Sequence, residues 1–78
     1  MSDVDDRITR IIASILLIEP SELTEKMARN EYETWDSMTH LTIVSQLELE
    51  FGIFFTDDEV VNMVTVADIR QTIRGKLT

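Results

Sequence analysis

Three residues near the middle of the chain have side chains that could do chemistry: Asp36, Ser37 and His40. Asp36 precedes an apolar pattern with helical spacing. Aspartate is a favoured N-cap, because its carboxylate accepts hydrogen bonds from free N–H groups of the first helical turn. Ser37 is then the first helical residue, and we expect its short side chain to point outward. An exposed hydroxyl there is well placed to carry a phosphate, because the free N–H groups and the helix dipole favour an anion.

A self-contained hydrolase is a poor interpretation of this serine. A nucleophilic serine needs a base within hydrogen-bond reach and an oxyanion hole. His40 follows Ser37 by three residues, a helical spacing at which side chains can touch. A pair on one exposed helix face has no cleft, however, so we assign no catalytic residue. We expect His40 to be a surface residue near the group on Ser37, or a partner contact.

The length and composition favour one small domain that spans residues 1–78. The chain has no cysteine, so it has neither a disulfide nor a thiolate metal site, and its one histidine leaves little for a zinc site. We therefore expect no metal. Apolar residues make up 44% of the chain, which is enough for a hydrophobic core.

Negative charge is concentrated in one half of the chain. The net charge of the whole is −8, yet residues 31–68 contain no Lys or Arg. The acids of this stretch are Glu31, Glu33, Asp36, Glu48, Glu50, Asp57, Asp58, Glu59 and Asp68. A field of one sign attracts basic partners and repels nucleic acid and anionic membranes. A solvated face that only confers solubility would look the same.

Nothing in the chain predicts a membrane or secretory protein. No stretch is long and apolar enough to cross a bilayer. The chain opens with acidic residues, whereas a secretory signal opens with basic ones. We expect a cytoplasmic protein without stable membrane insertion.

The first helix is predicted by apolar residues that alternate between steps of four and three. They are Val4, Ile8, Ile11, Ile15 and Ile18, with Ile12 and Leu16 widening the stripe. Pro20 should end the helix, because the residue before a proline avoids helical geometry.

A long connection follows, over residues 19–36, and long loops are often functional. Leu23 and Met27 are its expected anchors into the core, and residues 20–24 could form a short turn of helix. We expect Trp35 to be a packing residue of this loop, with a direct partner contact as the alternative.

Three more helices complete the chain. The second covers residues 37–51 and ends at Gly52, which favours left-handed geometry. The third opens with a capping box of Thr56 and Glu59 and runs to about Met63, and a similar box of Thr65 and Asp68 opens the fourth. The predicted core stripe of the second helix consists of Met38, Leu41, Val44, Leu47 and Phe51, after which Ile53, Phe54 and Phe55 re-enter the core. The fourth helix should bury Val66, Ile69, Ile73 and Leu77. The fold class is therefore all-α: a small four-helix bundle with three longer helices, a short third one and a long first loop.

These elements resemble the acyl carrier protein family over about residues 4–77. The likeness rests on Asp36-Ser37-Met38, on the turn that ends Leu47-Glu48-Leu49-Glu50-Phe51-Gly52-Ile53, and on the element order. The resemblance implies that Ser37 is the attachment point of 4'-phosphopantetheine, supplied from coenzyme A by an external phosphopantetheinyl transferase that Asp36 helps to engage. The chain would then be a carrier of acyl thioesters and a substrate of partner enzymes, rather than an enzyme.

The resemblance also implies that the second helix meets basic patches on acyl-loading and acyl-transferring enzymes. The expected partner-binding residues are Met38, Thr39, Thr42, Glu48, Asp57, Asp58 and Glu59. Fatty-acid-synthesis carriers usually have acids where this chain has Thr39 and Thr42, and leucine where it has Met38. We therefore expect a specialised carrier of fatty acid, polyketide or related biosynthesis. Because the chain starts at Met1 and stops soon after the fourth helix, we expect a stand-alone protein. We also expect it to be a monomer.

The core could also open to shelter an acyl chain. The candidate lining residues are Leu41, Val44, Leu47, Phe54, Val61 and Ile69, and ordinary packing explains each of them equally well.

Two alternatives stay open at this point. One is a peptidyl or aryl carrier that an adenylating enzyme loads. The other is a non-carrier acidic helical module that binds a basic partner, with Ser37 incidental.

Overall fold

The computed structural model describes residues 3–77, and its first helix, α1, covers Asp3–Leu16. The helix ends earlier than Pro20 predicts, because Leu17 adopts a left-handed φ of 63°. The Ile18 N–H then donates to the Ala13 carbonyl at 3.0 Å, which is the pattern of a Schellman cap. The prediction that the proline ends this helix is therefore wrong: a leucine in left-handed geometry ends it.

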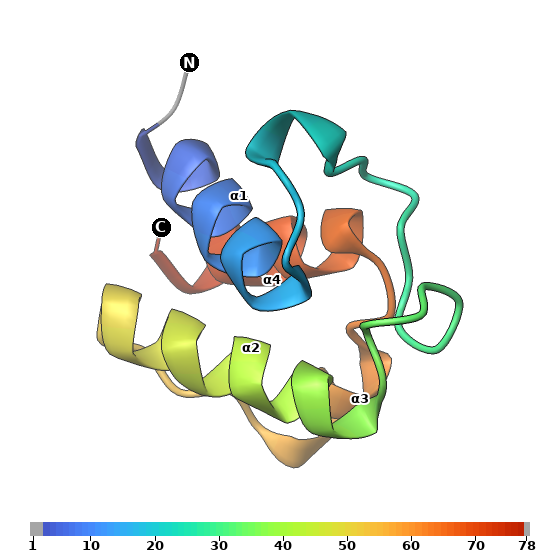
Figure 1. The fold of residues 1–78 in the computed structure, drawn as a ribbon. Helices are drawn as coiled ribbons and strands as arrows, with labels where there is room; N and C mark the ends of the chain where they lie inside the picture. The colour runs from blue at the N-terminus through green and yellow to red at the C-terminus, as the bar shows by residue number, and fades with distance from the viewer. Residues whose placement is uncertain (1–2, 78) are drawn as a thin grey trace.

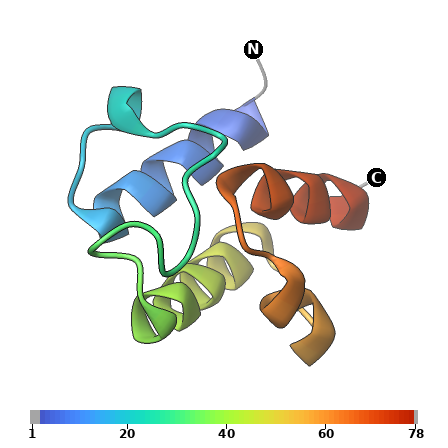
Figure 2. The ribbon, with the colours of Figure 1, turned by 90° about the vertical axis from the view of Figure 1, so that its right-hand side faces the viewer.

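The long connection wraps one side of the helices and is fixed at several points (Figure 2). It contains a short 3-10 helix, η1, at Pro20–Glu22, within the range where we predicted a turn of helix. Leu23 and Met27 pack against the core, as predicted. The Met27 carbonyl accepts a hydrogen bond from Val66 N–H at 3.0 Å, and Ala28 forms a bridge with Thr65. These contacts hold the loop against the start of the last helix.

The remaining helices begin and end close to their predicted residues. They are α2 at Ser37–Phe51, α3 at Asp57–Asn62 and α4 at Val66–Leu77. Gly52 ends α2 with a left-handed φ of 63°, as predicted. Both predicted capping boxes are present: Thr56 and Glu59 bond each other's backbone N–H groups at α3, and Thr65 and Asp68 do so at α4.

Helices α1, α2 and α4 enclose the core, and the short α3 packs near the first turns of α2 (Figure 1). The described residues form helices and one isolated bridge but no strand, so the all-α prediction is confirmed. Trp35 is fully buried, which confirms its packing role in the loop. The buried apolar cluster consists of Ile8, Ile12, Leu16, Trp35, Ile43, Val44, Leu47, Met63, Val66, Ile69 and Ile73. Leu77, predicted to be buried with the others of α4, is 42% exposed.

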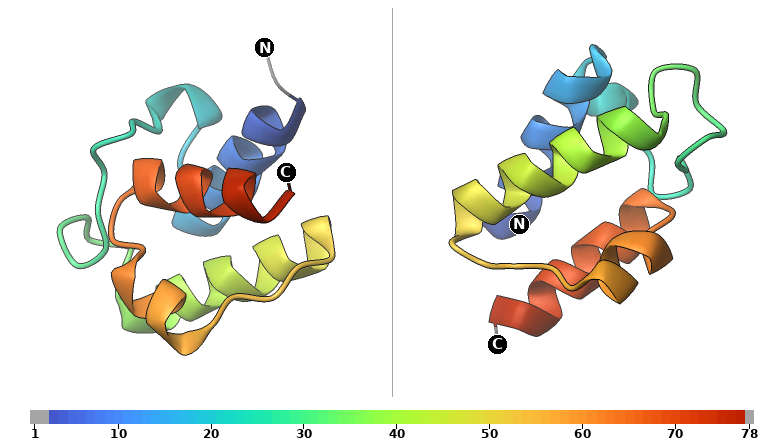
Figure 3. Two further views of the ribbon diagram at one scale, coloured as in Figure 1. Left: turned by 180° about the vertical axis from the view of Figure 1, so that it is seen from behind. Right: turned by 90° about the horizontal axis from the view of Figure 1, so that it is seen from below.

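Ionic contacts join the beginning of α1 to α4. Arg74 pairs with the carboxylate of Asp5, and Arg70 donates to the Asp5 carbonyl at 2.9 Å. Arg70 also pairs with Glu25 of the long loop at 2.8 Å. The start of α1 and the end of α4 therefore lie on one side of the molecule (Figure 3, left). The beginning of α2 lies on the opposite side, near the long loop and α3 (Figure 1).

Candidate functional site

The first turn of α2 displays Ser37 as the sequence predicts. Asp36 is extended, with φ −95° and ψ −172°, and its Oδ1 accepts a hydrogen bond from the Thr39 N–H at 2.9 Å. Ser37 is the first helical residue and is exposed. The first N–H groups of a helix have no intrahelical acceptors, so this end of α2 favours an anion near the Ser37 hydroxyl.

The carboxylate of Asp36 is stabilised in its charged form. The hydrogen bond from the backbone N–H of Thr39 holds the pKa of Asp36 below its ordinary value. The carboxylate thus stays ionised near neutral pH, with one oxygen directed into the helix cap. Asp36 thus places a negative charge on the residue next to Ser37, and the Thr39 N–H in the first turn of α2 stabilises that charge.

His40 lies beneath this turn and is not the surface residue that we predicted. Its side chain is only 1% exposed. The Trp35 indole Nε1–H donates to His40 Nδ1 at 3.1 Å, and the ring nitrogen Nε2 lies 3.1 Å from the Val60 carbonyl oxygen. Because an indole N–H can only donate, Nδ1 must be the acceptor, and the neutral ring then carries its proton on Nε2 and donates to Val60. Both nitrogens are therefore engaged, and a role for His40 as a partner contact is excluded by its burial.

The imidazole is held in its neutral form by its surroundings. Burial lowers the pKa of His40 below its ordinary value of 6.5, and the nearby positive charge of Arg29 acts in the same direction. A protonated ring would also present a second donor to the Trp35 N–H. This histidine is a structural link between the loop, α2 and α3, without the free nitrogen that a general base needs.

Arg29 completes the same junction from the long loop. Its guanidinium donates to the carbonyls of Val60 and Val61, at 3.5 and 3.0 Å. Both carbonyls belong to the end of α3, where the last carbonyls of a helix lack intrahelical donors. Val60 thus accepts from two side chains, one of α2 and one of the loop. We call Arg29, Trp35, His40 and the carbonyls of Val60 and Val61 the junction.

The predicted core stripe of α2 is wrong at its beginning. Met38 is 79% exposed and Leu41 is also exposed, whereas Leu47 is fully buried. Met38 and Leu47 are nine residues apart, which at 3.6 residues per turn is about two and a half turns. They must therefore face opposite sides of the helix. The buried residues of α2 are His40, Ile43, Val44 and Leu47, with Phe51 partly buried.

The six candidate acyl-lining residues divide into two groups by the exposure of their side chains. Val44, Leu47 and Ile69 are in the core, and a lining role for them stays a prediction. The core positions predicted for the other three are wrong, because the side chains of Leu41, Phe54 and Val61 are exposed.

The predicted partner-binding residues differ in how free their side chains are. The carboxylate of Glu48 accepts the Phe55 N–H at 2.9 Å, and that of Glu59 is paired with Lys76 at 2.7 Å. These two acids therefore also hold the α2–α3 connection and α3 in place. Asp57 and Asp58 are exposed at the start of α3.

The other three predicted partner-binding residues lie in the first turns of α2. Met38 is exposed, and Thr39 is partly buried. The Thr42 hydroxyl donates to the Met38 carbonyl at 3.2 Å. Partner binding by any of the seven stays a prediction.

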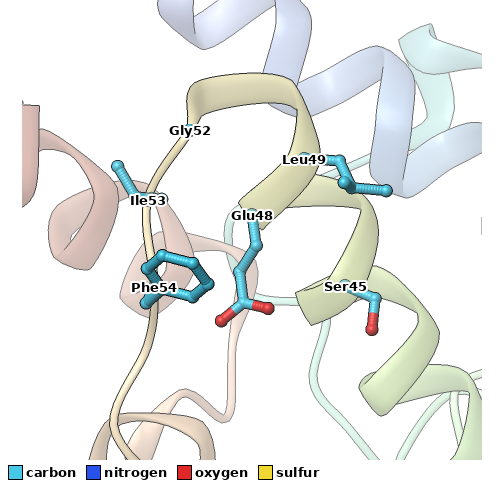
Figure 4. Close-up of a pocket in the computed structure, with 6 residues that line it drawn as sticks. All are labelled: Ser45, Glu48, Leu49, Gly52, Ile53 and Phe54. Carbon is cyan, nitrogen blue, oxygen red and sulfur yellow. The ribbon is translucent and has the colours of Figure 1, made fainter.

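An open groove at the far end of α2 was not predicted. It has a volume of about 470 Å³ and is lined by Ser45, Glu48, Leu49, Gly52, Ile53 and Phe54 (Figure 4). The expectation that Phe54 re-enters the core with Ile53 and Phe55 is wrong, since only Ile53 and Phe55 pack inward. The signal that could have revealed the groove is Leu49, an apolar residue between Glu48 and Glu50 that lies off the buried stripe.

No group of three or more His, Cys, Asp or Glu side chains among residues 3–77 could hold a metal ion. No helix in this range is long and apolar enough to cross a membrane.

Comparison with known proteins points to a carrier. No family model matches the chain. An acyl carrier protein of Phenylobacterium zucineum (strain HLK1) is 32% identical over 77 residues, covering 99% of this chain and 98% of the relative. An acyl carrier protein of Thermosynechococcus vestitus (strain NIES-2133 / IAM M-273 / BP-1) is 26% identical over 76 residues, covering 97% of this chain and 94% of the relative. Nearly the whole length of the chain is matched, residues 3–77 contain four α-helices, and an exposed serine begins the helix that Asp36 caps; the chain belongs to the acyl carrier protein family and is a carrier protein rather than an enzyme.

Proposed function

We propose that this carrier bears 4'-phosphopantetheine on Ser37 and delivers acyl groups, held as thioesters, to the enzymes of a biosynthetic pathway. The observation that carries the proposal is the exposed Ser37 at the first position of α2, directly after the Asp36 cap. Membership of the acyl carrier protein family supports the same assignment.

The surroundings of Ser37 fit a phosphodiester. The N–H groups of the first turn and the helix dipole favour its negative charge. The nearby Asp36 carboxylate opposes it, but that carboxylate accepts the Thr39 N–H at 2.9 Å. No buried group has to be uncovered for Ser37 to react, because the residue is already exposed.

The arm would supply a thiol, which the chain cannot supply because it has no cysteine. The protein's own contribution is position. The junction holds the loop and α3 against the first turns of α2, so that the arm would leave the molecule from a fixed point. Ser37 therefore acts as an attachment point, and its hydroxyl needs no base within this chain.

We further propose a specialised pathway rather than the housekeeping fatty acid synthase. The first turns of α2 present Met38, Thr39 and Thr42 and contain no acid after Asp36. A partner that depends on acids two and five positions after the serine would find two threonines instead. The expected partners are a phosphopantetheinyl transferase and acyl-loading and acyl-transferring enzymes with basic surfaces, which would meet a cytoplasmic monomer.

Modification can be measured as the mass of the intact protein after incubation with coenzyme A, magnesium and a broad-specificity phosphopantetheinyl transferase. The parent should gain one phosphopantetheinyl group, and Ser37→Ala should gain none. Ser45→Ala is the matched control, because Ser45 is another exposed serine of α2 and its variant should be modified like the parent. Absence of a mass gain in the folded parent with several transferases, or a gain in Ser37→Ala, would refute the assignment.

A further inference from the structure

We propose that the hydrogen bond between Trp35 and His40 is a proton-operated latch on the turn that precedes Ser37. While the imidazole is neutral the latch is closed, and the indole of Trp35 is tied to α2. When the ring takes up a proton the bond breaks, and the end of the long loop loosens while the helices stay folded. The inference goes beyond the proposed function and does not depend on it, because the latch forms without any group on Ser37.

The latch depends on which ring nitrogen of His40 carries the proton. Trp35 Nε1 lies 3.1 Å from His40 Nδ1, and His40 Nε2 lies 3.1 Å from the Val60 carbonyl oxygen. The indole can only donate and the carbonyl can only accept, so the neutral ring satisfies both when its proton is on Nε2. A second proton has to enter at Nδ1, where it would point at the indole N–H. Protonation and the closed latch therefore exclude each other.

The surroundings of the ring do not favour a buried imidazolium either. The side chain of His40 is 1% exposed, and a buried charge is costly unless it is paired. The guanidinium of Arg29 donates to the Val60 carbonyl at 3.5 Å, so one oxygen accepts from both side chains. Protonation would therefore place a second positive charge next to an existing one. The junction has to open before His40 can hold a proton at low cost.

The charged groups of the elements around the ring give an imidazolium no partner. They are Arg29 of the loop, Asp36 before α2, Asp57, Asp58 and Glu59 of α3, and Lys76 of α4, which pairs with Glu59. Among them, Arg29 is the group whose charge acts on the ring. Asp36 and Glu59 accept N–H groups in helix caps, and Asp57 and Asp58 are exposed. The bonds of the ring go to Trp35 and Val60 instead.

The end of the loop is a closed turn that can loosen as one unit. The Asn30 N–H donates to the Trp35 carbonyl at 2.7 Å, and the Trp35 N–H donates to the Tyr32 carbonyl at 2.9 Å. Within this turn, Trp35 is the one fully buried residue, and Tyr32 is partly buried. The Thr34 hydroxyl adds one bond to the Leu16 carbonyl at 3.1 Å. The latch is thus a large part of what holds the turn against α2, and segments with few buried contacts open first.

Opening of the latch should remain local. The indole of Trp35 keeps its apolar neighbours in the core cluster, because only its N–H loses a partner. The cap of α2 also persists, since Asp36 bonds the Thr39 N–H and not the ring. Trp35 stands two residues before Ser37, so opening changes the surface beside the serine while the helix that displays it stays intact.

The direction of the pH effect follows from the proton that the closed latch excludes. Burial lowers the pKa of His40 below its ordinary value of 6.5 while the latch is closed. An opened ring regains an ordinary pKa, so a fall in pH below 6.5 favours opening. For one proton, the ratio of open to closed molecules changes by at most about tenfold per pH unit.

The test is a pH titration of the isotope-labelled protein between pH 7.5 and 5, followed by NMR. The chain has one histidine and one tryptophan, so the imidazole and indole nitrogen signals need no further assignment. At pH 7.5 we expect a proton on Nε2 and none on Nδ1. As the pH falls, Nδ1 should gain a proton, and the indole N–H should shift and exchange faster with water at the same midpoint. Far-ultraviolet circular dichroism and the backbone amide of the buried Leu47 should stay constant through that midpoint.

Variants separate the latch from ordinary packing. Trp35→Phe removes the indole donor and keeps an aromatic ring, so His40 should titrate at a higher pH than in the parent. Tyr32→Phe is the matched control, because it removes a hydroxyl of the same turn that does not bond the imidazole. It should leave the midpoint of His40 unchanged. His40→Gln can accept from the indole and donate to Val60 without titrating, so its indole signal should stay constant.

Five results would overturn the inference. A proton on Nδ1 at pH 7.5 would contradict the geometry of the latch. Titration of His40 without a change at the indole would show that the two side chains are not coupled. Loss of the indole and helix signals together would show unfolding of the whole protein instead of local opening. Absence of any His40 titration above pH 5, or an unchanged midpoint in Trp35→Phe, would also refute the latch.

The titration can be repeated on Ser37→Ala with the same expected outcome. Modification of Ser37 is measured separately, by mass, so failure of the latch and failure of the proposed function are distinguishable.

Discussion

The two ends of α2 use aromatic and apolar side chains in opposite ways. At the first end, Trp35 and His40 are buried and their ring nitrogens are hydrogen-bonded. At the other end, Leu49 and Phe54 are mostly exposed and line an open groove. The junction is thus held by directional bonds inside the protein, whereas the groove presents an apolar surface to solvent.

This difference separates two kinds of contribution to a carrier. The junction determines the position of Ser37 relative to the loop and α3. Because both ring nitrogens of His40 are hydrogen-bonded in the junction, His40 keeps no free nitrogen. Leu49 and Phe54 of the groove are mostly exposed, so these two side chains contribute little to the core. Substitutions at the junction should therefore lower stability, and substitutions of Leu49 and Phe54 should leave it nearly unchanged.

The largest expected effect contrasts one aromatic residue from each end. Trp35→Ala empties a fully buried site and should cost about 3–5 kcal/mol of unfolding free energy. That approaches the whole stability of a domain this small, about 5 kcal/mol, so the variant should be largely unfolded. Phe54→Ala should change stability by about 0.5 kcal/mol or less. Urea unfolding followed by circular dichroism measures both. Similar losses in the two variants would contradict the contrast.

The next effect is a pH dependence that belongs to the junction alone. Burial lowers the pKa of His40 in the folded protein below the 6.5 of the unfolded chain. Between these two values the unfolded state binds more protons, so stability should fall as the pH is lowered from 6.5 towards the folded-state pKa. The slope for one proton is at most about 1.4 kcal/mol per pH unit.

Urea unfolding between pH 7.5 and 5 should reveal that slope in the parent. His40→Gln cannot titrate and should lack it, although the variant should be less stable at pH 7.5. Phe54→Ala should keep the slope of the parent. A slope that survives in His40→Gln would show that another group is responsible, since the carboxylates with lowered pKa, such as Asp36, act only at lower pH.

A smaller effect is expected for Arg29→Lys. A guanidinium can bond two carbonyls at once, as it does with Val60 and Val61, whereas an ammonium is a single point donor. Losing one of these bonds should cost about 1 kcal/mol. Amide exchange at the end of α3, for example at the N–H of the C-cap residue Met63 that bonds the Glu59 carbonyl, should become faster. Arg10→Lys, at an exposed residue of α1, should leave that exchange unchanged.

The smallest stability effect is expected at the groove. Leu49→Gln should change the free energy of unfolding by no more than about 0.5 kcal/mol, because the side chain is 78% exposed. Thermal unfolding of the variant and the parent measures this difference. A large loss of stability would show that Leu49 supports the core, and the comparison between the two ends of α2 would no longer hold.

Local signals predicted much of the fold. Helix caps and stops depend only on residues within four positions in the chain. Those predicted at Asp36, Gly52, Thr56 and Thr65 are each present. The resemblance of the whole chain to acyl carrier proteins was confirmed by its relatives. The end of α1 was missed, because a leucine in left-handed geometry contradicts ordinary residue preference.

The contacts around the site could not be predicted in the same way. His40 and Val60 are twenty residues apart in the chain, and their contact depends on how α3 packs. The positions of the apolar residues along α2 also could not decide which of its two apolar faces is buried. Met38 and Leu41 lie on one, Ile43 and Leu47 on the other, and only tertiary packing selects between them.

The hydrogen bond from Trp35 to His40 has an optical consequence. Trp35 is the one tryptophan of the chain, so all tryptophan emission of the protein arises at the junction. The protein therefore contains its own fluorescent reporter, a short way from Ser37 and far along α2 from the groove. Binding events that move the loop or α3 should change this emission, and binding confined to the groove should leave it constant, without any label being attached.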